Sequence, residues 1–283
     1  MTNPKAKLPP VVLAVAGSDS SGGAGIQADL RAISANGGYG ATAITALTAQ
    51  NTTGVTGVVA APAAFVVEQM MAVFDDLSVS AIKTGMLGDS ELIEAVSHCL
   101  RERTEIPTVI DPVMVATSGA VLLADSAITA LKCQLLPLAT LLTPNRHEAR
   151  VLTGITVDSV QDAERAAKAL VELGVGAALV KGGHGEDPNW AVDVLWDGRE
   201  LTHWRYSRLQ TKHTHGTGCT LSSAIAAQLG RGRPLVQAVS QARAYLQGAI
   251  ANGLDLGKGH GPTDHFWWLD REQNFVAKMP QSS

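Results

Sequence analysis

The sequence predicts an α/β fold in which helices cover both faces of a mostly parallel sheet. Short apolar runs alternate with helix-like segments over most of the chain. The run at 11–16 is apolar throughout, as expected for a strand buried on both faces of a parallel sheet. Two segments at 192–196 and 201–206 flank an Asp-Gly turn, which predicts a small hairpin at the sheet edge. We therefore expect a three-layer α/β/α sandwich.

The other elements follow in order from the same alternation. Strands are expected at 41–47, 80–85, 108–113, 140–144 and 177–184. Helices are expected at 26–33, 62–75, 90–101, 124–135, 161–173, 217–229 and 235–252. Asp89 is suited to cap the third of these helices, and Pro234 suits the start of the last.

The composition is typical of a soluble protein, and the length fits one large domain. No linker or repeat interrupts the 283 residues, and we assign the domain to 11–270, between tails at 1–10 and 271–283. A net charge of −4 gives no basic surface for nucleic acid. No apolar run approaches the roughly 18 residues of a membrane span. The cysteines, Cys99, Cys133 and Cys219, suit a reducing cytoplasm and are too scattered for a zinc site.

The stretch Thr214-His-Gly-Thr-Gly-Cys-Thr220 leads directly into an apolar segment of small residues that resembles a helix. Gly216 and Gly218 allow a ligand to approach the backbone closely. The first amides of a helix lack intrahelical acceptors and lie at the positive end of its dipole, so they can bind a phosphate. A thiol at this position, Cys219, is expected to be pushed toward the thiolate. The alternative is a glycine turn before a buried helix with a packed cysteine.

Polar features gather where the predicted strands end. They are Ser18–Gly25, Gln50, Lys83–Met86, Asp111, Asn145 with Glu148, Lys181 and Gly216–Cys219. Ligands of parallel α/β sheets bind beyond the carboxyl ends of the strands. We therefore expect these features to share one site.

Phosphoryl transfer needs a cation on the phosphates, a metal, donors around the transferred group and a base. Lys181 can supply the cation, and Glu148 with Asp111 can hold Mg²⁺ through waters. The Gly216–Cys219 amides can surround the phosphate, and Cys219 can act as the base.

Each of these residues also has a structural alternative. Glu148 is equally suited to the first turn of a helix, where the dipole favours an acid. Lys181 resembles a solvated charge at a strand end, and Asp111, before Pro112, resembles a turn residue. Gln50, a lone glutamine, resembles a surface residue.

The chain resembles the hydroxymethylpyrimidine/phosphomethylpyrimidine kinases of thiamine biosynthesis, which belong to the ribokinase-like superfamily. The matching segments are Ala16–Asp29, Ile44–Thr52, Lys83–Leu87, Asp111–Met114, Thr143–Glu148, Val180–His184, Thr214–Thr220 and Gly257–Pro262. They follow the order of the family and span nearly the whole chain.

The resemblance implies a ribokinase-like fold and two successive reactions. ATP phosphorylates the hydroxymethyl group of 4-amino-5-hydroxymethyl-2-methylpyrimidine, and a second transfer onto this monophosphate gives the diphosphate. The resemblance also implies a homodimer. The second nucleophile is a phosphate that is already ionised, so the base is expected to matter mainly in the first step.

The resemblance also assigns residues to the substrate. Gln50 contacts the pyrimidine, whose aminopyrimidine edge matches the donor and acceptor of an amide. The residues implied around the ring are Gly17, Ala24, Met86 and Val113, with Asp29 nearby.

For the reaction itself, the resemblance puts Cys219 in the place of the aspartate base of the sugar kinases. The amides of Thr217, Gly218 and Cys219, beside Gly216, form the anion hole. The nucleotide is served by Lys181, Asn145 and Thr214, and Mg²⁺ by Glu148. Arg146 and His147 depart from the small or apolar residues expected between Asn145 and Glu148.

Pyridoxal kinase is the nearest alternative, because its fold is the same and its ring substrate also bears a hydroxymethyl group. Cys219 together with Gln50 favours the pyrimidine. A non-catalytic binding protein would be expected to lack Lys181, Glu148 or the glycines, all of which are present. A dinucleotide oxidoreductase is disfavoured because the loop at 17–25 lacks the G-x-G-x-x-G pattern.

Overall fold

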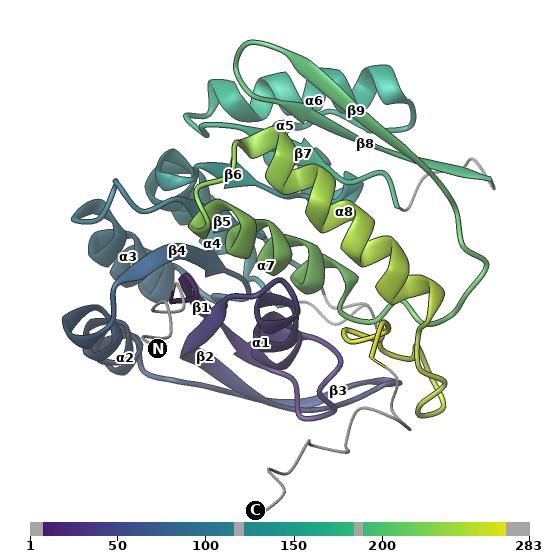
Figure 1. The fold of residues 1–283 in the computed structure, drawn as a ribbon. Helices are drawn as coiled ribbons and strands as arrows, with labels where there is room; N and C mark the ends of the chain where they lie inside the picture. The colour runs from purple at the N-terminus through teal and green to yellow at the C-terminus, as the bar shows by residue number, and fades with distance from the viewer. Residues whose placement is uncertain (1–7, 116–121, 184–188, 270–283) are drawn as a thin grey trace, which may run out of the picture.

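The computed structural model describes residues 8–115, 122–183 and 189–269, and within these ranges a single nine-stranded sheet forms the centre of the molecule (Figure 1). Its strand order is β3-β2-β1-β4-β5-β6-β7-β8-β9. The strands are β1 (Val11–Ser18), β2 (Tyr39–Asn51), β3 (Gly54–Ala60), β4 (Val79–Thr84), β5 (Thr108–Ile110), β6 (Leu141–Leu142), β7 (Ala178–Val180), β8 (Trp190–Trp196) and β9 (Leu201–Ser207). Pairing is parallel from β2 to β7 and antiparallel at both edges. The predicted parallel sheet and the β8–β9 hairpin are confirmed.

The opposite edge carries a second hairpin that the sequence analysis did not predict. β3 turns back antiparallel on β2, with Ala60 opposite Ala46. The Asn51 side chain closes the turn by accepting hydrogen bonds from the amides of Thr53 and Gly54, at 2.8 and 3.2 Å. Because β3 is exposed along most of its length, its sequence carries no buried alternation that would reveal it.

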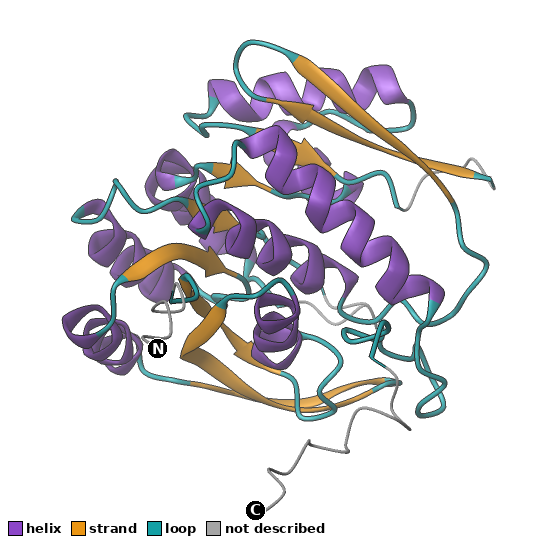
Figure 2. Ribbon diagram, viewed as in Figure 1, coloured by secondary structure: helices purple, strands orange, loops and turns teal. Residues whose placement is uncertain are grey.

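Helices cover both faces of the sheet (Figure 2). One face is covered by α1 (Gly25–Ala35), α7 (Thr217–Gly230) and α8 (Leu235–Ala251). The other is covered by α2 (Ala63–Asp76), α3 (Ser90–Arg101), α4 (Asp125–Ala130), α5 (Arg146–Thr153) and α6 (Val160–Glu172). A π-helical turn, Leu131–Leu135, continues α4 and completes the helix expected at 124–135. Asp89 caps α3 as predicted, since its Oδ1 accepts a hydrogen bond from the Leu92 amide at 2.9 Å.

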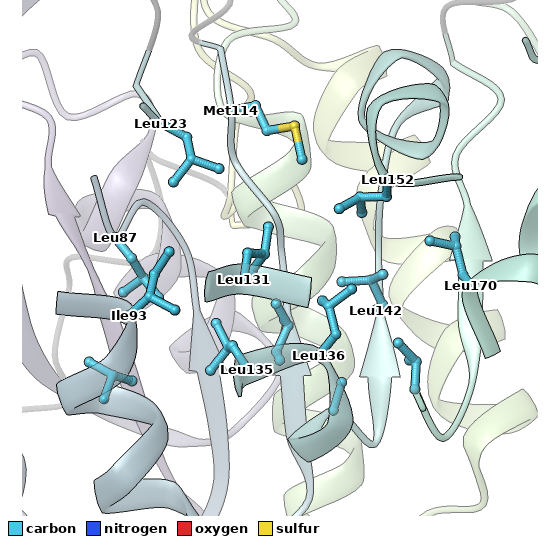
Figure 3. Packing of buried hydrophobic residues seen from close by; sticks show 14 of the residues in the cluster. Leu87, Ile93, Met114, Leu123, Leu131, Leu135, Leu136, Leu142, Leu152 and Leu170 are labelled. Carbon is cyan, nitrogen blue, oxygen red and sulfur yellow. The ribbon is translucent and has the colours of Figure 1, made fainter. Parts of the chain in front are cut away.

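Side chains of β1 show how the strands separate two cores. Val12 and Ala14 pack toward α1, α7 and α8, whereas Leu13 and Val15 pack toward the opposite helices. Figure 3 shows part of the larger core, in which residues from several helices meet the sheet. The sheet is therefore buried on both faces, as the apolar runs predicted.

The described helices give no candidate for crossing a membrane, since none combines the necessary length and apolarity. α7 is buried from Thr220 to Gln228, and it packs against α1, α8 and strands β1, β4 and β5. Its small residues permit this close packing on several sides. The N-terminus of α7 is thereby fixed at the carboxyl ends of the central strands.

Candidate functional site

Two adjoining cavities lie at the carboxyl ends of the parallel strands, with volumes of about 300 and about 370 Å³. The first is lined by most of the residues expected for substrate and catalysis: Gly17, Ala24, Gln50, Met86, Asp111, Val113, Glu148, Gly216, Thr217, Gly218 and Cys219. The second is lined by those expected for the nucleotide: Lys181, Asn145 and Thr214. Thr214, Thr217 and Gly218 line both cavities. The start of α7 therefore forms the boundary between them.

The loop before α7 packs on the loop between β1 and α1. Gly216 has a positive φ of 79°, and a Cβ at this position would collide with the carbonyl oxygen of Gly23. His215 lies beside it, buried, with its Nε2 2.8 Å from Oδ2 of Asp19. This contact joins two loops that are far apart in the sequence.

Asp19 organises the loop between β1 and α1. Its Oδ2 accepts hydrogen bonds from the amides of Gly23 and Ala24, at 3.1 and 2.8 Å, and its Oδ1 accepts two from Ser21. Burial alone would raise the pKa of Asp19, but the hydrogen bonds from His215, Ser21 and the backbone outweigh it and lower the pKa. The carboxylate is thus ionised in the folded protein.

The sequence analysis assigned no role to Asp19 or His215. The signal for Asp19 was present, because an aspartate followed by small residues and glycines favours side-chain bonds to nearby amides. His215 gave none, since its partner lies on a distant segment.

Gln50 lies at the end of β2 and lines the first cavity. Its backbone is fixed by Ser20, whose Oγ donates to the Gln50 carbonyl oxygen at 2.7 Å and accepts from the Gln50 amide at 2.8 Å. The Gln50 side chain lies 3.2 Å from Thr48 Oγ1 and 3.5 Å from His215 Nε2. A half-buried amide held in this way is suited to contact a polar ring edge.

Asp111 and Lys181 form an ion pair at the strand ends, with Lys181 Nζ 2.9 Å from Asp111 Oδ1. The Ser222 hydroxyl of α7 lies 3.4 Å from Asp111 Oδ2. Burial alone would lower the pKa of Lys181, but the carboxylates of Asp111 and Glu148 raise it above its ordinary value. The interpretation of Lys181 as a solvated charge is therefore wrong, because the side chain is paired and largely buried.

Glu148 occupies the first turn of a helix and also faces the first cavity. It is the third residue of α5 and forms a capping box with Asn145, with reciprocal distances of 2.8 and 2.9 Å. It is also buried and lines the first cavity. Burial raises the pKa of Glu148 to about 7 even though Lys181 acts to lower it.

The described residues contain no group of three or more His, Cys, Asp or Glu side chains placed to hold a metal ion. Glu148 and Asp111 are two carboxylates at the first cavity. Mg²⁺ is commonly held by one or two carboxylates with waters and substrate phosphates rather than by a protein cage. The donor set therefore fits Mg²⁺ bound together with a nucleotide.

Cys219 lines the first cavity from the first turn of α7. Burial raises the pKa of its thiol to about 11, with Asp29 and Asp111 also raising it and Lys83 lowering it. The expectation that the helix terminus makes Cys219 a thiolate is therefore wrong for the ligand-free site. Burial and two nearby carboxylates outweigh the groups that favour the anion.

Asp29, which the resemblance placed near the substrate, does not line either cavity. It is fully buried below the first cavity and paired with Lys83, whose Nζ lies 2.8 Å from its Oδ1. Lys83, one of the polar strand-end features, is likewise fully buried.

The second cavity contains polar residues that the sequence analysis missed. The carboxylate of Asp193, on β8, accepts hydrogen bonds from the Gly182 amide and the Tyr206 hydroxyl, both at 2.7 Å. Arg243 of α8 lies 3.0 Å from the same carboxylate. These contacts attach the β8–β9 hairpin to α8 and to the strand end that carries Lys181. The alternation within β8 predicted the hairpin but not which of its polar residues is buried.

Known proteins resemble this chain over most of its length. The family model described as phosphomethylpyrimidine kinase matches residues 19–264. A hydroxymethylpyrimidine/phosphomethylpyrimidine kinase of Rhizobium meliloti is 52% identical over 266 residues, which cover 92% of this chain and 99% of the relative. A thiamine biosynthesis bifunctional protein of Geobacter sulfurreducens is 48% identical over 257 residues, covering 90% of this chain and 52% of the relative.

A solved structure has the same fold. The pyridoxal kinase of Staphylococcus aureus, in complex with AMP-PCP and pyridoxal, superposes with a TM-score of 0.83 at 33% identity. The match covers 92% of this chain and 94% of the other.

Replacing Gly216 with alanine is expected to disturb the site, whereas the same change at Gly232 should not. The two glycines have nearly equal φ of +79° and +78°, so either alanine should cost about 1–2 kcal/mol in backbone strain. Only at Gly216 would the new Cβ also collide with the neighbouring loop, since nothing lies within 4 Å at Gly232. Thermal unfolding and steady-state kinetics should show a small stability loss with unchanged KM for G232A, and a larger loss with raised KM for G216A. Equal KM values would show that the site tolerates separation of the two loops.

Proposed function

The chain belongs to the phosphomethylpyrimidine kinase family, and on this premise we propose how its residues divide the two phosphoryl transfers between them. The protein is an ATP-dependent kinase of thiamine biosynthesis. It phosphorylates 4-amino-5-hydroxymethyl-2-methylpyrimidine and then the resulting monophosphate. The assignment of individual residues below is our proposal.

The observation that carries the proposal is that Gln50, Glu148 and Cys219 line one cavity from three distant segments. The pyrimidine occupies this cavity, with its amino edge against Gln50 and its hydroxymethyl group toward Cys219. Met86 and Val113 contribute apolar walls to the same cavity, which suits a flat ring.

ATP occupies the second cavity, with its phosphates toward Lys181 and the start of α7. Leu209, Leu246 and Ile250 give the cavity an apolar part that suits a base, and Asn145 and Thr214 lie on its wall. Because Thr217 and Gly218 line both cavities, the γ-phosphate passes the amides of α7 as it moves from ATP to the pyrimidine. These amides neutralise charge on the transferred group.

Glu148 and Asp111 would hold Mg²⁺, which would supply charge neutralisation for the phosphates. Lys181 pairs with Asp111, whereas Glu148 is buried with a raised pKa. A nearby cation would stabilise the ionised form of both carboxyl groups.

Cys219 acts as the base of the first transfer. In its thiolate form it accepts the proton of the substrate hydroxyl, and the oxygen then attacks the γ-phosphorus. The second transfer starts from a phosphate oxygen that is already ionised, so it needs no base.

The proposed assembly is a homodimer in the cytoplasm. Large apolar side chains are exposed on β2, β3 and α2, namely Leu47, Val58, Val59 and Phe65, which is the composition expected of a surface that a second copy covers. Cys99, Cys133 and Cys219 are free thiols, which suits a reducing compartment.

Substrate competition tests the proposed use of the cavities. Protein, ATP and Mg²⁺ are offered equal amounts of hydroxymethylpyrimidine and pyridoxal, and products are followed by mass spectrometry. We expect pyrimidine monophosphate to appear first and diphosphate later, with pyridoxal phosphate as a minor product. If pyridoxal phosphate is the main product, the first cavity binds pyridoxal in preference to hydroxymethylpyrimidine, and the proposed substrate is wrong.

Cys219→Ala is expected to slow the first transfer by about 10²–10⁴-fold, the usual effect of losing a general base, and to slow the second much less. Because the pKa of Cys219 is near 11, the rate of the first step should rise with pH between about pH 6 and about pH 9. This rise should disappear in C219A.

Single-turnover assays with each substrate measure both effects, and Cys133→Ala, at an exposed cysteine, is the control. Equal losses in both steps would exclude Cys219 as a base.

Gln50→Leu is expected to raise the KM for hydroxymethylpyrimidine by about 2–10-fold, the effect of losing one or two neutral hydrogen bonds. The KM for ATP should stay nearly unchanged, because Gln50 lines only the first cavity among the two. Initial-rate measurements with each substrate varied in turn give both KM values. If only the KM for ATP rises, Gln50 does not contact the pyrimidine.

A further inference from the structure

A buried cation lies close to the first cavity and has no part in the mechanism described so far. Lys83 of β4 is fully buried, and its Nζ contacts Oδ1 and Oδ2 of Asp29 at 2.8 and 2.9 Å. Ser223 of α7 donates its hydroxyl to the same Oδ1 at 2.8 Å. Asp29 and Ser223 are also fully buried. We call Lys83, Asp29 and Ser223 the buried lysine cluster.

The cluster lies immediately behind the wall of the first cavity. A Cβ on Gly85 would come within 2.9 Å of Lys83 Nζ and 3.0 Å of the Ala16 side chain. Ala16 and Met86, which follows Gly85, both line the cavity. The ammonium group is therefore sealed from the cavity but close to it.

The cluster also lies one helical turn from the Cys219 thiol on two helices. Ser223 follows Cys219 by four residues on α7, so the two share one face of the helix. On α1, Asp29 follows Gly25 by four residues, and the Gly25 amide acts to lower the pKa of the Cys219 thiol. The first turns of α1 and α7 thus meet at the thiol, and their second turns meet at the cluster.

Stability alone gives little reason to bury such a pair. Removing two charges from water is costly, and apolar residues of similar volume often serve a core equally well. Within the described residues, the oxygens that Lys83 Nζ contacts all belong to Asp29, which leaves one N–H of the ammonium without a protein acceptor. The ammonium of the cluster therefore has hydrogen-bonding capacity that its own contacts do not use.

Charged groups act on Cys219 from the elements packed around it. Lys83 on β4 and Lys181 after β7 favour the thiolate, whereas Asp29 on α1 and Asp111 after β5 disfavour it. Burial opposes the thiolate most strongly, and Lys83 is the side chain that counteracts it most. Asp29 also holds the ammonium charged, since its carboxylate raises the pKa of Lys83 against the effect of burial.

We propose that Lys83 is a positioning residue for the first phosphoryl transfer, because its buried ammonium stabilises the Cys219 thiolate that accepts the hydroxyl proton. The proposal rests on the function of Cys219 as a base. In this step the substrate O–H bond breaks and its proton moves to the sulfur. The oxygen bonds to the γ-phosphorus while the bond between that phosphorus and the ADP oxygen breaks. Asp29 and Ser223 hold the ammonium in place.

The test removes both charges at once, since a single change would leave an unpaired buried ion. The double variant Lys83→Met, Asp29→Asn keeps similar volumes and an acceptor for Ser223. It is compared with Asp29→Asn alone, in a Cys133→Ser background that removes the exposed thiol. Circular dichroism and thermal unfolding establish that each variant is folded.

Two readouts separate an effect on the thiol from an effect on structure. The first is the rate at which iodoacetamide alkylates Cys219 in the ligand-free protein at about pH 9, followed by peptide mass spectrometry. The second is the single-turnover rate of each phosphoryl transfer. In the double variant we expect alkylation and the first transfer to slow by about tenfold, which corresponds to one pKa unit, with the second transfer changed less than about twofold.

Asp29→Asn alone should also change alkylation. It speeds alkylation where Lys83 stays charged, because a carboxylate that disfavours the thiolate is removed, and slows it where Lys83 loses its proton without Asp29. It also keeps the proposal testable if the double variant does not fold. A folded double variant with unchanged alkylation overturns the proposal, as does Asp29→Asn with unchanged alkylation. Equal slowing of both transfers with unchanged alkylation would assign the cluster a purely structural role.

Failure of the base itself gives a different result. If Cys219→Ala keeps the first transfer at the wild-type rate, the proposed function of Cys219 is wrong whatever the cluster does. If Cys219→Ala loses the first transfer but the double variant keeps it, only the inference about Lys83 is wrong.

Discussion

The burial of α7 is the constraint on which the site depends. The helix contacts α1, α8 and three central strands, and its residues from Thr220 to Gln228 are buried. A helix can be enclosed in this way only if its side chains are small, and the segment that follows Cys219 is rich in alanine and serine. Because the body of α7 is enclosed, its first turn is held at the strand ends, where Thr217 and Gly218 border both cavities and Cys219 borders the first. The packing of one helix thus fixes the position of the amides that we propose bind phosphate.

The loops at 19–24 and 214–216, which line the first cavity, are joined to each other as well as to the sheet. Asp19 accepts hydrogen bonds from its own loop and from His215, which is 196 residues away in sequence. A charged acceptor with several donors makes a strong and directional contact. The backbone of Gly216 fits closely against Gly23 at the same place. The first cavity therefore has a preformed shape, which lowers the entropic cost of orienting the substrate.

The sequence predicted those features that depend on local pattern. Apolar alternation predicted the sheet, the β8–β9 hairpin and nearly all helices, and the position of polar residues at strand ends predicted the cavity. The features that the sequence did not predict depend on contacts between residues that are far apart in the chain. The pairing of Asp29 with Lys83 was not predicted, because the two residues are 54 positions apart. Cys219 was expected to ionise because burial cannot be judged from seven residues. β3 was missed because an exposed edge strand needs no apolar pattern. Asp193 and His215 were missed because their partners lie on other elements.

The raised pKa of Cys219 is consistent with a site that must accept two different nucleophiles. An aspartate base would be anionic in both steps, and in the second it would repel the incoming phosphate at close range. A thiol whose pKa is near 11 is neutral at physiological pH, so it admits the monophosphate without repulsion. The same neutrality is a disadvantage in the first step, where a proton acceptor is required. A cation sealed behind the cavity wall reduces this disadvantage, because it favours the thiolate without offering the phosphate a competing contact. In the mechanism that we propose, the need to serve an alcohol and a phosphate in one cavity thus accounts for both a thiol at position 219 and a buried lysine beneath it.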